Sequence, residues 1–243
     1  MAWCDGLVVP DDSALVFVGE MYGIQLDQLA TVLGATQRRA AAQVARWRAA
    51  GTADAAALSA GPRWVWLTRA GLRACGLPYR ASAPGLSRLA HLRAVTACRL
   101  ALAATPQVAA GGAYWRSERR LRARMGGRIA LREHVPDAEL HWPENAALPW
   151  AGECWAIEAE LTPKTAARTI TIMRELLSRT GDYGCPAADV GVPGRPPRHA
   201  RAIYLCTPAA QPVVSRARDG LGLLGARIEI RLLPAAALRA SIP

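Results

Sequence analysis

Three carboxylates in the second half of the chain have the residue types and the spacing of a metal-binding site. Asp137 lies in the run Val135-Pro136-Asp137-Ala138-Glu139-Leu140, and Glu158 and Glu160 lie within Cys154–Leu161. At the two-residue period of a β-strand, both glutamates point to one face while apolar residues point to the other. Carboxylate oxygens are the ligands that Mg²⁺ prefers, and Mg²⁺ keeps positions open for water and phosphate. The pattern therefore predicts phosphodiester cleavage that depends on Mg²⁺ or Mn²⁺.

One basic residue close to these carboxylates stands out by its type. Lys164 is the only lysine in a chain with 30 basic residues. Arginine cannot replace lysine where a compact ammonium that can lose a proton is needed. We therefore expect Lys164 to act together with Glu160, by steadying either the scissile phosphate or the nucleophile.

The charge of the chain predicts a polyanionic partner, with nucleic acid first and an anionic membrane second. The formal net charge is +11 and the sequence pI is about 10.2. Basic residues outnumber acidic ones 14 to 2 in residues 61–134 and 8 to 2 in residues 193–243, whereas residues 135–192 carry 9 acidic and 4 basic residues. Cationic segments around an acidic one suit a site that holds a DNA backbone and a metal. The alternative is basic surface spread evenly over an arginine-rich protein.

The sequence also argues against several other classes of protein. The 6 cysteines form no C-x-x-C pair, which speaks against a zinc site or a disulfide framework. The N-terminus lacks the charged start of a signal peptide, and Arg99 and Pro106 interrupt the most apolar stretch. We therefore expect a cytoplasmic, nucleoid-associated protein without a membrane segment.

Residues 1–80 are predicted to form a winged helix-turn-helix domain. Helices are expected at 12–22, 25–33 and 37–50, with a tight turn at 34–36, and two short strands at 54–67 would form the wing. Polar side chains near the start of the third helix suit contacts in a major groove. The predicted DNA contacts are Gln37, Arg38, Arg39, Gln43, Arg46 and Arg63. The alternative is a helical module for dimerisation.

A helical connector at 81–107 and an α/β domain with a mixed central sheet at 108–243 are expected to follow. Helices are predicted at Tyr114–Met125, from Thr162 to about Arg179, and at Gln211–Leu221. Strands are predicted at Ile129–His134, Glu139–Trp142, Cys154–Leu161, Ala200–Cys206 and Ala226–Leu232, and a Gly- and Pro-rich loop at Gly181–Pro197.

Pro136-Asp137, followed by Glu158-Ala159-Glu160 on this order of elements, resembles the PD-(D/E)xK (restriction endonuclease-like) nuclease superfamily. The resemblance implies that Asp137 and Glu158 bind the metal and that Glu118 joins them from the preceding helix. In that superfamily a lysine two residues after the strand carboxylate assists the attacking water. Here Glu160 occupies that position, and Lys164 is the candidate to supply the ammonium.

A winged helix is followed by Trp115-Arg116-Ser117-Glu118-Arg119, by Pro136-Asp137 and by Glu158-Ala159-Glu160-Leu161-Thr162-Pro163-Lys164. With these motifs, nearly the whole chain resembles the replication-relaxation proteins of actinobacterial plasmids and integrative elements. That resemblance implies a DNA-binding protein, as a homodimer or with other mobile-element proteins, in replication, mobilisation or maintenance of the element. Three alternatives stay open. One is that the carboxylates form a solvent-facing strand edge paired with arginines. The second is a catalytically inactive, nuclease-like DNA-binding regulator of replication or transcription. A nickase using Tyr114 or Tyr183 is the third, although the usual histidine triad of such enzymes is missing.

Overall fold

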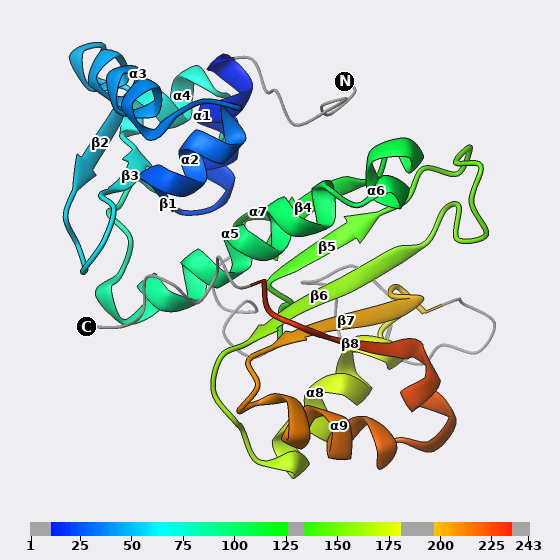
Figure 1. Ribbon diagram of the computed structural model, residues 1–243. Coiled ribbons are helices and arrows are strands. Elements are labelled where there is room, and N and C mark those ends of the chain that lie inside the picture. Colours follow the sequence, from blue (N-terminus) through cyan, green and yellow to red (C-terminus); the bar gives the residue numbers. More distant parts are fainter. Residues whose placement is uncertain (1–10, 126–133, 181–196, 235–243) are drawn as a thin grey trace. The chain divides into compact units, whose positions relative to one another are not determined.

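The computed structural model describes residues 11–125, 134–180 and 197–234, and the chain divides into two compact units (Figure 1). The first unit extends to Ala110 and the second spans Gly111–Leu233. Each unit has its own β-sheet. The strand expected at Ile129–His134, the loop expected at Gly181–Pro197 and Tyr183 lie wholly or almost wholly outside the described residues.

The first unit packs helices against a three-stranded antiparallel sheet with the order β1-β3-β2. Its helices are α1 (Asp11–Glu20), α2 (Leu26–Val32), α3 (Gln37–Ala49), α4 (Arg69–Ala74), α5 (Leu89–Ala103) and, at the boundary, α6 (Pro106–Gly111), with a 3-10 turn η1 (Leu86–Arg88) before α5. Its strands are β1 (Ile24–Gln25), β2 (Ala53–Ala56) and β3 (Trp64–Leu67).

Local sequence accounts for the position of α3. The Thr36 side chain accepts a hydrogen bond from the Arg39 backbone N–H at 3.3 Å and so caps the helix. Before the cap, Gly34 takes the left-handed conformation with φ of 57°, which permits the tight turn from α2. Ala40, Val44 and Trp47 follow the helical period and are buried.

The predicted connector helix α5 packs within the first unit. Arg93 of α5 is buried and forms an ion pair with Asp27 of α2 at 2.7 Å. The Gln28 side chain donates to the Arg93 carbonyl at 2.9 Å. These contacts between polar groups in the interior fix α5 against α2.

The second unit is built on a five-stranded mixed sheet with the order β4-β5-β6-β7-β8. Strand β5 pairs in antiparallel register with both β4 and β6, and β7 and β8 continue the sheet in parallel to β6. The prediction of an α/β fold with a mixed sheet is confirmed. Its strands are β4 (Tyr114–Ser117), β5 (Ala138–His141), β6 (Cys154–Glu160), β7 (Arg201–Cys206) and β8 (Ile228–Leu232), and its helices are α7 (Glu118–Met125), α8 (Ala166–Ser178), α9 (Gln211–Asp219) and the 3-10 segment η4 (Gly222–Arg227).

Two helix boundaries differ from the prediction. The expected helix Tyr114–Met125 begins only at Glu118, because the first four residues pair with β5 as strand β4. The helix expected to open at Thr162-Pro163 begins at Ala166, where Thr165 caps it by accepting from the Arg168 backbone N–H. Lys164 therefore lies just before α8 and not within it.

Helices α8 and α9 cover one face of this sheet (Figure 1). Met173 and Leu176 of α8 and Val214 of α9 belong to a buried apolar cluster with Ala156 of β6 and Tyr204 of β7. Glu158 and Glu160 share the face of Ala156, because side chains alternate along a strand. Six of the seven residues of β6 are buried, so both faces of this strand are covered.

Candidate active site

Strand register brings Asp137 next to Glu158. Ala138 of β5 pairs with Ile157 of β6 in antiparallel register, and Asp137 directly precedes this pair. The Asp137 carboxylate accepts a hydrogen bond from the backbone N–H of Ala159 at 2.8 Å. Two residues that are 21 positions apart in sequence thus become neighbours on adjacent strands.

Glu158 is buried beside a histidine that the sequence analysis did not single out. Its carboxylate lies 2.6 Å from Nε2 of His134. Burial raises the pKa of Glu158 to about 7, with His134 lowering it and Asp137 raising it further. For His134, burial lowers the pKa, but the carboxylates of Glu158, Asp137 and Glu175 together outweigh burial, so the net pKa is raised. A proton is therefore held between the two side chains near neutral pH.

Glu160 and Lys164, which we expected to act together, are in contact. The Lys164 ammonium donates to the Glu160 carboxylate. Glu160 is buried, whereas the Lys164 side chain is about one-third exposed. The lysine is thus directed at the glutamate although it lies outside the helix.

Glu118 begins α7 beside Asp137. Its backbone N–H donates to the Asp137 carbonyl at 3.0 Å, while its carboxylate accepts from Arg122 at 2.7 Å. The backbone of Glu118 is therefore adjacent to the predicted ligand, and its carboxylate is engaged by an arginine one turn further along α7.

Tyr204 is a second residue of this region that the sequence analysis missed. It pairs with Glu158 in the parallel register of β6 and β7, and its side chain shares the glutamate's face. The residue is 1% exposed, and its hydroxyl has no hydrogen-bond partner among the described residues. Burial, then the charges of Glu158 and Glu160, raise its pKa well above the usual value. The sequence offered only one signal, a tyrosine between Ile203 and Leu205 in a strand predicted to be buried.

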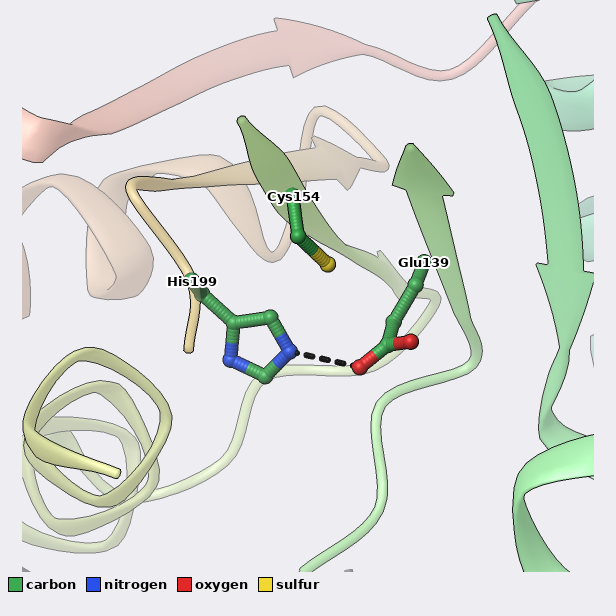
Figure 2. A group of neighbouring side chains, drawn as sticks. All are labelled: Glu139, Cys154 and His199. Carbon is green, nitrogen blue, oxygen red and sulfur yellow. Dashed lines mark hydrogen bonds and ion pairs between the residues drawn. The ribbon is translucent and has the colours of Figure 1, made fainter. Parts of the chain in front are cut away.

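The tightest group of potential metal ligands lies elsewhere on the same sheet. Among the described residues, ligand atoms of Glu139, Cys154 and His199 all fall within 4.8 Å of one another (Figure 2). No sequence spacing indicated this group, since its members come from β5, β6 and the approach to β7. Asp137, Glu158 and Glu160 are less closely gathered than this.

Electrostatics favour an ion-pair network at Glu139 over a metal site. The buried carboxylate contacts Arg198 at 2.6 and 2.9 Å, His199 at 2.9 Å and His141 at 2.8 Å. Burial opposes ionisation, but these donors together lower the pKa of Glu139 far below its usual value. Burial also raises the pKa of the Cys154 thiol, so the sulfur stays protonated. A divalent cation would have to displace an arginine from an already saturated carboxylate.

The predicted DNA-contacting residues are exposed with one exception. Gln37, Arg38, Arg39 and Arg46 of α3 and Arg63 between β2 and β3 are exposed. The prediction that Gln43 faces solvent is wrong, because it shares the buried stripe of α3 and is 5% exposed. Its side chain instead accepts from Arg46.

Comparison of the chain with protein-family models, curated proteins and solved structures finds no match. Among the described residues, no helix has both the length and the apolar character needed to cross a membrane. The function is therefore inferred from the residues of this chain and their geometry.

Proposed function

We propose that this chain is a DNA-binding protein of a plasmid or integrative element that cleaves phosphodiester bonds with Mg²⁺ or Mn²⁺. Its role would be in the replication, mobilisation or maintenance of that element. The observation that carries the proposal is the placement of Asp137 beside Glu158 on adjacent strands, with Glu160 on the same face. The second unit would act as a PD-(D/E)xK-like nuclease domain.

The first unit supports DNA binding. Its order of helix, strand, two helices and two strands, with the sheet order β1-β3-β2, agrees with a winged helix-turn-helix. The exposed residues Gln37, Arg38 and Arg39 lie in the first turn of α3, where they are able to approach a DNA groove.

The donor set near Asp137 and Glu158 fits a hard divalent cation. Its acidic ligand atoms are carboxylate oxygens, and the unpartnered hydroxyl of Tyr204 lies on the same face. A cation here would displace His134 from Glu158, and at Glu160 it would replace the contact with Lys164. Asp137 and Glu158 would hold the ion, and Glu160 would hold a second ion or orient water. When bound, Mg²⁺ lowers the pKa of a coordinated water and neutralises phosphate charge. Lys164, held at Glu160, would steady the scissile phosphate or the nucleophile.

The test of cleavage uses supercoiled, linear and branched DNA with Mg²⁺ or Mn²⁺. We expect the intact protein to nick or cut, and Asp137→Asn and Glu158→Gln to lose at least a hundredfold in rate. Glu229→Gln is the matched control, since this carboxylate is exposed on β8 and pairs only locally with Arg231. Absence of metal-dependent cutting by the intact protein on every substrate would refute the nuclease.

One observation favours a second candidate, a nuclease-like regulator without catalysis. His134 and Lys164 already neutralise Glu158 and Glu160, which fits carboxylates that serve the fold. A regulator would bind DNA equally well in chelator, and Asp137→Asn would leave that binding intact.

DNA binding is tested separately on α3. Arg38→Ala combined with Arg39→Ala should weaken binding to all DNA sequences. The slope of log K against log salt concentration should become shallower by about 1–2, because each phosphate contact contributes about 0.9 to this slope. Arg73→Ala, at an exposed arginine of α4, is the control. An unchanged salt slope in the double variant would remove α3 from the interface.

A further inference from the structure

We infer that the Tyr204 hydroxyl positions a metal-bound water between the Asp137–Glu158 pair and the core of the second unit. The inference rests on the proposed metal site and deepens it. Tyr204 would act as a positioning residue, because it touches the water and not the ion.

The first support is the orphaned hydroxyl itself. Tyr204 lies in β7, between two strands, and is 1% exposed. A buried hydroxyl without a partner loses its hydrogen bonds to water, and nearly all buried polar groups avoid this loss. Its persistence in the centre of the sheet therefore points to a partner that is a solvent molecule or a ligand.

The second support is what surrounds the hydroxyl on this face. Glu158 is the register partner of Tyr204, and Glu160 is the partner of Cys206 two residues further along. Both glutamates and Asp137 act electrostatically on the phenol. A tyrosine phenol is protonated at neutral pH, so its O–H is a donor and its oxygen an acceptor. A water bound to a cation at Asp137 and Glu158 would both donate to this oxygen and be oriented by it.

The experiment measures Mn²⁺ affinity and folding stability of Tyr204→Phe. Mn²⁺ binding is followed by calorimetry and by electron paramagnetic resonance, so no cleavage is needed. Loss of an outer-shell partner typically weakens metal binding tenfold or more, so we expect the Mn²⁺ Kd to rise about tenfold. In chelator the same change removes an unsatisfied buried group, so we expect the folding equilibrium constant to stay equal or increase up to tenfold.

A positioning role therefore predicts weaker Mn²⁺ binding together with unchanged or greater stability, whereas a structural role predicts a loss of stability. Tyr79→Phe is the matched control, because the Tyr79 hydroxyl donates to Glu20 at 2.7 Å in the first unit. This control should lose stability in chelator and keep the Mn²⁺ Kd of the wild type.

Three results decide the inference. It is overturned if Tyr204→Phe binds Mn²⁺ within a factor of two of the wild type, or if it loses stability in chelator as a satisfied hydroxyl would. It is also overturned if the wild-type protein binds no Mn²⁺ at millimolar concentration. If Tyr204→Phe weakens Mn²⁺ binding but the wild type cleaves no DNA, the inference stands and the nuclease function fails.

Discussion

Removal of the Glu139 carboxylate should destabilise the second unit more than any other single charge change considered for this chain. The side chain is fully buried and accepts from Arg198, His199 and His141, and Arg116 lies 3.5 Å away. Glu139→Ala would leave these groups without their common anion. Loss of one partner from a buried ion pair costs about 3–5 kcal/mol.

His199 makes this cost difficult to avoid. Its Nε2 faces Glu139, and its Nδ1 lies 3.0 Å from the Leu176 carbonyl, so both ring nitrogens face oxygen acceptors. The side chain is inaccessible to solvent. Without Glu139, the His199 ring would lose a hydrogen-bond acceptor, and water could not easily take its place in this buried site.

Urea unfolding of the intact chain in chelator is the assay, with Glu229→Gln as the control. The control removes an exposed carboxylate next to Arg231, so we expect its free energy of unfolding to change by less than about 0.5 kcal/mol. A loss below about 1 kcal/mol for Glu139→Ala would refute the ion-pair network. Added Zn²⁺ should not stabilise the wild type, and a rise of several degrees in Tm would instead favour a metal at Glu139, Cys154 and His199.

Two further predictions concern stability. Folding raises the pKa of Glu158 from 4.5 to about 7 and also raises the pKa of His134. The folded state therefore keeps protons that the unfolded chain loses as the pH rises. We expect the free energy of unfolding to fall by up to about 3 kcal/mol from pH 5 to pH 8. Glu158→Gln should flatten this slope in urea titrations at several pH values, and an unchanged slope would contradict the assignment. Gly71→Ala should lower the free energy of unfolding by about 1–3 kcal/mol, because the added Cβ would lie 1.9 Å from the Thr52 carbonyl oxygen. The control is Gly85→Ala, whose Cβ would meet no atom within 4 Å, so we expect it to be neutral or slightly stabilising. Equal urea-unfolding midpoints for the two glycine variants would show that α4 shifts freely away from Thr52.

Periodicity and caps predicted much of the local structure. Thr36 and the apolar stripe ending at Trp47 define α3, because both signals lie within a few residues of each other. The alternation in Cys154–Leu161 likewise predicted β6 and the common face of Glu158 and Glu160. Such signals need only the residues of one element.

One error arose where long-range pairing overrides local preference, and another where a helical position overrides the polarity of its residue. Tyr114–Ser117 reads as the start of a helix, yet its backbone groups pair with β5 across the chain. Gln43 was expected in solvent because it is polar, but its helical position places it on the buried stripe. For Tyr114–Ser117 the deciding interaction involves residues distant in sequence, whereas the burial of Gln43 follows the local helical period of Ala40, Val44 and Trp47.

The sequence by itself determined the carboxylates at Asp137, Glu158 and Glu160, the lone lysine and the basic charge of the chain. Only the tertiary structure decided that His134 and Tyr204 join them, and that Glu139 is the centre of a buried ionic network. The physical reason is that strand register and burial set which charges meet and how strongly they interact, and both depend on pairings between segments that no local pattern encodes.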